Sequence, residues 1–363
     1  MEPSCPQITN TDSTVLWDTG STDLLLPRSN CTTCGGHALF NPSSSSTFSP
    51  EPNLPAELFF GTGGDSVPLP DIESVSGTVV ADVVSAGGLT AYTQSFLLAD
   101  AYGPALNYQP IDGIMGLGPA NASGLGEITG ISTLLPFYWN LYQAGALASP
   151  VFSWFIRPGH EHGAELTLGG INPARHQEEI QYIDLEKELS AGRGKWVMEQ
   201  STTIYVDGAP VQVGRRDSRP PDLAVLDTGT PFVLTPDFTA ARDLYAAISP
   251  AISLIDPLGA WGAPCDELDD AAADVTFTFG PPGGVRGNFT VFKRFFNLGP
   301  YPGLDGVCQA AFSSPGEDEG EVANQDTGQR VWAVGSPLLK AYYTVWDGID
   351  LRVGFARPRC GGG

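Results

Sequence analysis

The chain has 363 residues, of which 42% are apolar and 16% charged, and it contains 44 Gly and 31 Pro. This length fits two domains of ordinary size, and the abundance of turn-forming residues favours short strands over helices. Against 41 Asp and Glu there are 18 Lys and Arg, so the net charge is −23. This balance excludes a nucleic-acid binder with a basic footprint and disfavours an anionic membrane surface as a partner.

The first informative segment is an apolar stretch that leads into an Asp-Thr-Gly turn. Residues 14–27 have the sequence TVLWDTGSTDLLLP, so Asp18 follows apolar residues at the expected end of a buried strand. The glycine two residues later permits close backbone approach, and the neighbouring hydroxyls can hydrogen-bond to a carboxylate. One such segment is not specific, because ordinary turns favour the same residues.

Further along, short runs rich in Val, Thr, Phe and Tyr predict strands at residues 77–84, 94–98, 275–279 and 342–346. Helices are predicted only at residues 131–143 and 236–248, the second with Thr235 as its N-cap. Residues 43–49 and 313–329 are predicted surface loops. No apolar run is long enough for a membrane span.

An internal repeat divides the chain into two halves. Residues 223–236, LAVLDTGTPFVLTP, repeat the first segment and place Asp227 in the same position as Asp18. A second apolar, glycine-containing element occurs at residues 111–117 and again at 331–335. We therefore expect two related lobes, residues 1–172 and 173–363.

Two such loops, facing each other across a two-fold axis, predict specific chemistry. Carboxyl groups held that close cannot both ionise readily, so they share a proton. One carboxylate can then activate a water while its protonated partner donates to a carbonyl oxygen. Asp18 and Asp227 are therefore the candidate catalytic pair.

The motifs VLWDTGST, FFGTG, IDGIMGLG, AVLDTGTP and VGSPLLKAYYTVWD resemble those of the pepsin-like aspartic peptidases, over about residues 14–356. The resemblance implies a mainly all-β, bilobal fold with pseudo-two-fold symmetry, a few short helices and a deep cleft. It also implies an aspartic endopeptidase that works without a metal or organic cofactor, at acidic pH and with a preference for apolar residues. We expect a monomer with polypeptide substrates.

The resemblance also assigns roles by position. The hydroxyls of Ser21 and Thr230 are expected to hydrogen-bond to the two aspartates. Thr19 and Thr228 are expected to hold the two loops together. Gly20 and Gly229 are expected to offer backbone N–H groups to the carboxylates. The segment Phe60, Gly61 and Thr62 corresponds to the flap that closes over substrate, and Ile114 and Val225 to cleft walls.

The sequence departs from the family pattern at the flap. Phe60 replaces the usual Tyr, and Leu25 replaces the Trp to which that Tyr would hydrogen-bond. Because both partners are lost together, the change can be nearly neutral for stability. We therefore expect the flap to be held by apolar contact and the enzyme to have an altered rate or specificity.

Residues 65–73 predict an elongated flap. Residues 1–13 lack the expected first strand, so we expect either an incomplete sequence or a first lobe without that element. Ser336 replaces a frequent Asp.

Six cysteines allow 15 pairings. The pairing we expect is Cys31–Cys34, Cys265–Cys308 and Cys5–Cys360, although the Cys-x-x-Cys spacing of the first pair also occurs in redox and zinc sites. His160 and His162 suggest a solvated loop rather than a metal site, and we predict no metal.

The sequons at Asn30, Asn121 and Asn288 predict glycosylation and hence a secreted protein, or one in a vacuole-like acidic compartment. A different class of function stays open. The same fold could serve as a catalytically weak or silent binding or inhibitor protein.

Overall fold

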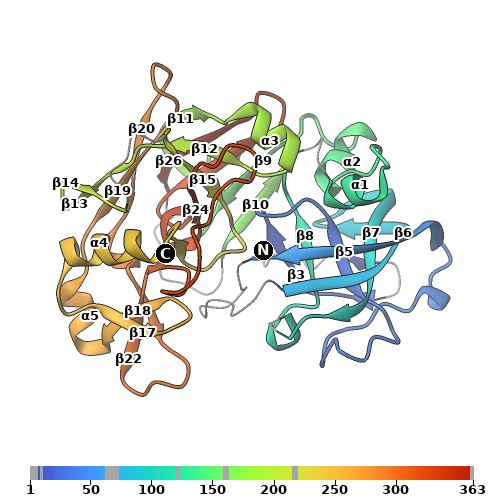
Figure 1. Cartoon of the computed structure of the whole chain (residues 1–363). Coiled ribbons are helices and arrows are strands. Elements are labelled where there is room, and N and C mark those ends of the chain that lie inside the picture. The colour runs from blue at the N-terminus through green and yellow to red at the C-terminus, as the bar shows by residue number, and fades with distance from the viewer. Residues whose placement is uncertain are drawn as a thin grey trace.

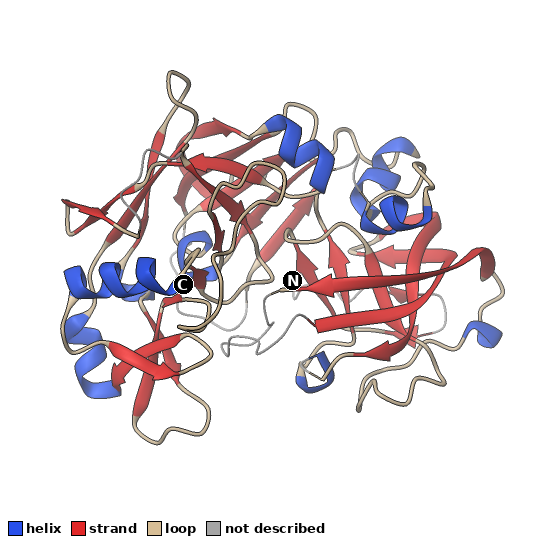
Figure 2. Ribbon diagram, in the orientation of Figure 1, coloured by secondary structure: helices blue, strands red, loops and turns tan. Residues whose placement is uncertain are grey.

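The computed structural model describes residues 7–8, 11–61, 73–104, 106–119, 123–157, 163–214 and 220–359. In Figure 1, the blue to cyan segments form one lobe on the right, and the yellow to red segments form a second lobe on the left. Strands dominate both lobes, while the helices are short (Figure 2). The mainly β, two-lobed fold expected from the sequence is confirmed.

The strands of the described residues form four sheets. The sheet of the first lobe has the spatial order β2 (Thr11–Asp12), β1 (Gln7–Ile8), β6 (Glu73–Ala86), β7 (Leu89–Tyr102), β4 (Leu24–Pro27), β8 (Gly113–Gly116) and β3 (Val15–Asp18), with β5 (Ser49–Phe60) paired to β6.

The main sheet of the second lobe has the order β14 (Ala209–Gln212), β13 (Thr203–Val206), β19 (Val275–Phe279), β12 (Val197–Gln200), β15 (Asp222–Leu226), β24 (Val331–Val334), β16 (Val233–Leu234) and β23 (Phe312–Ser313), with β20 (Gly287–Val291) paired to β19. A smaller sheet beside it has the order β17 (Ser253–Asp256), β18 (Ala260–Pro264), β22 (Val307–Ala310) and β21 (Asn297–Pro300).

The sequence repeat corresponds to a repeat in strand pairing. In the first lobe β8 pairs in parallel with β3 and antiparallel with β4. In the second lobe β24 pairs in parallel with β15 and antiparallel with β16. Each Asp-Thr-Gly segment therefore follows a strand whose parallel neighbour comes from the second repeated element, and this shared arrangement fixes where each loop begins.

A further sheet joins the two halves, in the order β10 (Glu165–Leu168), β9 (Val151–Phe155), β25 (Tyr343–Asp347), β26 (Arg352–Pro358) and β11 (His176–Asp184). Beside it, the rings of Phe152, Trp196 and Trp346 pack on one another with centroids 5.2 to 5.7 Å apart, and all three are fully buried. Because strands from before and after residue 172 share this sheet, the division at 172 and 173 stays a prediction.

Two of the helices were predicted, and both are shorter than expected. The helices are α1 (Gly124–Thr129), α2 (Phe137–Gln143), α3 (Lys187–Arg193), α4 (Phe238–Ile248), α5 (Cys265–Ala271) and α6 (Ser336–Leu339), with 3₁₀ turns at Pro42–Ser44, Leu106–Tyr108 and Lys293–Phe295. Among the described residues, no helix is long and apolar enough to cross a membrane.

Two helix predictions need correction. The helix predicted at 131–143 begins only at Phe137, because Pro136 occupies its N-cap and the preceding residues form turns. The cap of α4 is Asp237, not Thr235, because the Asp237 carboxylate accepts a hydrogen bond from the Ala240 N–H at 2.7 Å. The predicted strands lie within β6, β7, β19 and, shifted by one residue, β25.

Candidate active site

The structure brings the two Asp-Thr-Gly loops together between the lobes. The first loop is anchored where the Leu117 N–H donates to the Asp18 carbonyl at 2.7 Å. The second is anchored where the Asp227 N–H donates to the Val334 carbonyl at 3.0 Å. A Cβ placed on Gly229 would lie 2.6 Å from Asp18 Oδ1 and 3.1 Å from Asp227 Oδ1. Both carboxyl groups therefore border the same small space.

Two threonines hold the loops against each other by reciprocal hydrogen bonds. The Thr19 hydroxyl donates to the Leu226 carbonyl at 3.1 Å and accepts from the Thr228 N–H at 3.0 Å. The Thr228 hydroxyl donates to the Trp17 carbonyl at 2.8 Å and accepts from the Thr19 N–H at 3.0 Å. Since each hydroxyl satisfies one donor and one acceptor of the opposite lobe, the relative position of the loops is tightly constrained.

Each carboxylate is also fixed by its own loop. The Gly20 N–H donates to Asp18 Oδ1 at 2.7 Å, and the Ser21 hydroxyl donates to Asp18 Oδ2 at 2.5 Å. Asp227 receives the same two bonds, from the Gly229 N–H and the Thr230 hydroxyl, both at 2.7 Å. The same two kinds of donor therefore fix the position of each carboxyl group within its loop.

The environment favours a shared proton. Asp18 is only 6% exposed. Burial raises the pKa of Asp18 to about 7, and Asp227 adds to the rise through its charge and a side-chain hydrogen bond. The Ser21 hydrogen bond and the Lys195 charge act in the opposite direction on this pKa. One carboxyl group of the pair therefore stays protonated in acid, beside a second that can act as a base.

The segment predicted to be the flap lies beside the first Asp-Thr-Gly loop. Phe60 and Leu58, at the end of β5, pack on an apolar cluster that contains Leu25 and Ile114. With Ser21 and Lys195 they border a hollow of about 140 Å³, which we call the flap hollow. The expected apolar contact between Phe60 and the Leu25 region is thus present. Gly61 is exposed, and Thr62 and most of the predicted insertion at 65–73 lie outside the described residues.

The two predicted cleft-wall residues are placed differently. Ile114 is 4% exposed and belongs to the apolar cluster beneath the flap. Val225 packs instead in a separate small cluster with Leu189 and Val197. Neither side chain borders the flap hollow, so their contact with substrate stays a prediction.

A buried polar network that no motif in the sequence indicated lies beside the first loop. Asp23, which is 7% exposed, accepts hydrogen bonds from the hydroxyls of Thr22 at 2.6 Å and Ser123 at 2.5 Å, and from the Leu125 N–H at 3.2 Å. Burial raises the pKa of Asp23, and these hydrogen bonds oppose the rise. The network ties the first loop to α1. Only its position in the Asp-Thr-Gly-Ser-Thr-Asp segment could have drawn attention to Asp23.

Lys195 is a second residue at the site that no sequence motif indicated. Its ammonium group donates to the Gly20 carbonyl and borders the flap hollow. The sequence gives one signal: cations are scarce in this chain. That signal cannot place Lys195 beside a loop from the other half.

The sequence profile of the eukaryotic aspartyl protease family matches residues 8–358. The chain belongs to this family. It is 31% identical over 350 residues to an aspartic protease of Phaffia rhodozyma, which covers 95% of this chain and 73% of that protein. It is 27% identical over 351 residues to pepsin A of Sus scrofa (95% and 77%) and 26% identical over 357 residues to mucorpepsin of Rhizomucor miehei (95% and 75%). The enzyme class is therefore aspartic-type endopeptidase.

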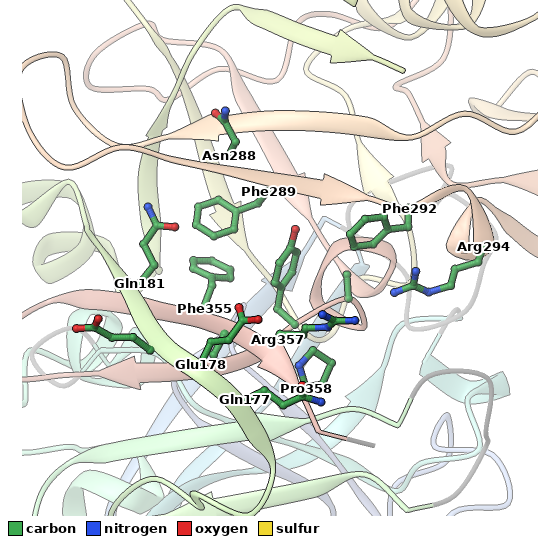
Figure 3. A pocket seen from close by; sticks show the side chains of 14 residues that line it. Gln177, Glu178, Gln181, Asn288, Phe289, Phe292, Arg294, Phe355, Arg357 and Pro358 are labelled. Atoms are coloured by element: carbon green, nitrogen blue, oxygen red, sulfur yellow. The ribbon is translucent and has the colours of Figure 1, made fainter. Parts of the chain in front are cut away.

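A larger hollow, of about 820 Å³, lies elsewhere in this aspartyl protease. Figure 3 shows Phe289 and Phe355 facing each other in it, with Arg357 and Glu178 below them and Arg294 beside Phe292. The ring centroids of Phe289 and Phe355 are 4.1 Å apart. None of its lining residues belongs to either Asp-Thr-Gly loop. Its size therefore does not make it the catalytic site.

The structure contains the disulfides Cys31–Cys34 and Cys265–Cys308, with Cα atoms 5.6 and 4.7 Å apart. Cys5 and Cys360 lie outside the described residues, as do Asn121, His160 and His162. Asn30 and Asn288 are exposed, which leaves both side chains accessible to modification. Within the described ranges, no group of three or more His, Cys, Asp or Glu side chains is arranged to hold a metal ion.

Proposed function

We propose that the protein cleaves polypeptides with Asp18 and Asp227 as its catalytic pair. The observation that carries the proposal is that both carboxyl groups border one space, each fixed by a glycine N–H and a hydroxyl of its own loop. Asp18, with a pKa raised to about 7, holds the proton of the pair, and Asp227 is the base.

In this mechanism a water bound between the carboxyl groups attacks the scissile carbonyl carbon. Asp227 takes a proton from that water as the new C–O bond forms, and Asp18 donates its proton to the carbonyl oxygen. Collapse of the tetrahedral intermediate breaks the C–N bond, and the leaving nitrogen takes the proton held by Asp227. The pair then carries one proton again, because Asp18 recovers the proton from the hydroxyl group of the intermediate.

The same geometry supports activity in acid and a preference for apolar residues. Above a pH of about 7, Asp18 loses its proton, and the carbonyl oxygen then lacks its donor. Below that pH the pair keeps one proton. Leu25, Leu58 and Phe60 border the flap hollow and offer apolar contact to the carbon atoms of a substrate side chain.

We also propose a secreted monomer, or one held in an acidic compartment. The two disulfides support an oxidising environment, and the exposed sequons at Asn30 and Asn288 fit glycosylation. A net charge of −23 disfavours binding to nucleic acid.

The first test is cleavage of denatured casein at acidic pH by the full-length protein, with and without pepstatin. We expect cleavage that pepstatin inhibits and that Asp227→Asn reduces at least about 10³-fold, the size of effect typical of losing one member of a catalytic unit. Activity that survives in Asp227→Asn contradicts the assigned pair. No cleavage by the folded wild type favours the binding or inhibitor protein.

A further inference from the structure

The flap hollow combines apolar walls with charged groups at its edges. Leu25, Leu58 and Phe60 form an apolar side, while Lys195 and Glu127 are the charged residues at its border, apart from the buried Asp23. Glu127 is exposed on α1, and Lys195 is partly buried. Lys195 is therefore the one cation among the lining residues that the structure describes.

The backbone around Lys195 is held firmly between the lobes. Gly194 ends α3 in the left-handed conformation, and a Cβ on Gly118 would lie only 2.4 Å from its carbonyl oxygen. Trp196 is fully buried, and its indole N–H donates to the Leu117 carbonyl at 2.9 Å. The Trp196 carbonyl accepts from the Leu226 N–H at 3.0 Å. These contacts on both sides fix the backbone from which the Lys195 side chain extends, and the Gly20 carbonyl positions its ammonium group.

The ammonium group has donor capacity to spare. It can donate three hydrogen bonds, and the Gly20 carbonyl takes one. No acidic side chain in the described part of the chain forms an ion pair with it. The nearby titratable groups are Asp18 and Asp227 of the pair, Asp23 behind it and Glu127 across the hollow. Lys195 lowers the pKa of Asp18, so its charge is felt at the catalytic pair.

We propose that Lys195 is a specificity-determining residue that binds a substrate carboxylate, so that the enzyme favours peptides with Glu or Asp close to the scissile bond. The proposal rests on the proposed function, because it requires a peptide to lie across the Asp18–Asp227 pair. A side chain that enters the flap hollow meets apolar walls along its stem and an ammonium group at the border. In a protein with a net charge of −23, an acidic substrate residue is otherwise repelled.

The test uses peptides with blocked ends and one apolar cleavage site, carrying either Glu or Gln at each of three positions on either side. At pH 5.5 and low salt, a Glu side chain is mostly ionised, because its ordinary pKa is about 4.3. We expect kcat/KM at one position to be about five- to tenfold higher for Glu than for Gln, as for a partly screened charge pair.

For each variant, the ratio of kcat/KM for the Glu peptide to kcat/KM for the Gln peptide then isolates the role of Lys195. Lys195→Met should bring the ratio to about one or below, and Lys195→Arg should keep it above one. The matched control Lys187→Met, an exposed lysine on α3 outside the flap hollow, should keep the wild-type ratio. A ratio that survives in Lys195→Met overturns the proposal, as does a wild-type ratio near one at every position.

Wild-type measurements keep the proposal testable even if the variants do not fold. The ratio should fall toward one in 0.5 M NaCl, since salt screens a charge pair that is partly open to solvent, and again at pH 3.5, where Glu is mostly protonated. A ratio that is insensitive to both overturns the proposal. Cleavage of the Gln peptides by wild type but not by Asp227→Asn shows that the proposed function holds independently. If no peptide is cleaved, the proposed function fails and this inference fails with it.

Discussion

The two Asp-Thr-Gly loops have the same internal hydrogen bonds and different surroundings. In both, a glycine N–H and a hydroxyl donate to the aspartate. Five residues after Asp18 the chain has the buried, hydrogen-bonded Asp23, whereas five residues after Asp227 it has the buried, apolar Phe232. Lys195 contacts the carbonyl of Gly20, and no cation of the described residues contacts the equivalent carbonyl of Gly229.

This comparison separates two requirements of the site. The shared hydrogen bonds position the carboxyl groups, and they require the same residues in both loops. The unequal surroundings act on Asp18, whose pKa is raised by burial and lowered by the charge of Lys195. The symmetry therefore provides the geometry of the pair, and the asymmetry places different charged groups around the two loops.

Among the variants that test this comparison, the largest effect is expected from the glycines that approach the opposite aspartate. A Cβ on Gly20 would lie 2.4 Å from Asp227 Cγ, and one on Gly229 would lie 2.6 Å from Asp18 Oδ1. Because misplacing a reacting group by about 1 Å can cost about 10²-fold, we expect Gly20→Ala to lower kcat/KM by at least that factor. Gly229→Ala should have a smaller effect, since Gly20 meets three carboxyl atoms at 2.6 Å or less and Gly229 only one.

Gly36→Ala is the matched control for this pair of variants, because a Cβ there meets nothing within 4 Å. Its kcat/KM should stay within about twofold of wild type, as is usual for surface substitutions. Steady-state kinetics on one peptide compares all three variants. Near wild-type activity in Gly20→Ala contradicts the close approach of the loops.

The second comparison concerns the two threonines between the loops. Thr19→Val removes a hydroxyl that satisfies the Thr228 N–H and the Leu226 carbonyl, and a buried polar group left without a partner costs about 1–3 kcal/mol. Thr19 is fully buried and Thr228 only partly, so Thr19→Val should lower the free energy of unfolding more than Thr228→Val.

Urea denaturation measures both threonine variants against Thr93→Val, an exposed threonine on β7 that should change stability by less than about 0.5 kcal/mol. Equal losses in the free energy of unfolding for Thr19→Val and Thr228→Val would show that the difference in burial between the two threonines does not affect stability. No loss for either would show that the reciprocal hydrogen bonds do not stabilise the fold.

The sequence was sufficient for the symmetric part of this site and not for the asymmetric part. Asp18 and Asp227 could be paired because both lie in recognisable copies of one segment, each following an apolar strand. Lys195 and Gly20 are 175 residues apart, and Ser123 and Asp23 are 100 apart. Contacts between residues that belong to no repeat have no local signal. The short helix α1 was missed for a related reason, since six residues contain too little periodicity to predict.

The smallest expected effect is a change in how stability depends on pH. Because burial raises the pKa of Asp18 to about 7, from an unfolded value near 3.9, the folded protein binds a proton that the unfolded chain has released between those two pH values. The stability that this group contributes to the wild-type protein is therefore present at low pH and lost as pH rises through about 7.

The variant Asp18→Asn has no such proton. Its Tm should exceed that of wild type at pH 8 by a few degrees, at roughly 2–4 °C per kcal/mol, and the difference should shrink at pH 5. Differential scanning calorimetry at the two pH values measures it, and a difference that is the same at both would show that Asp18 does not hold the proton of the pair.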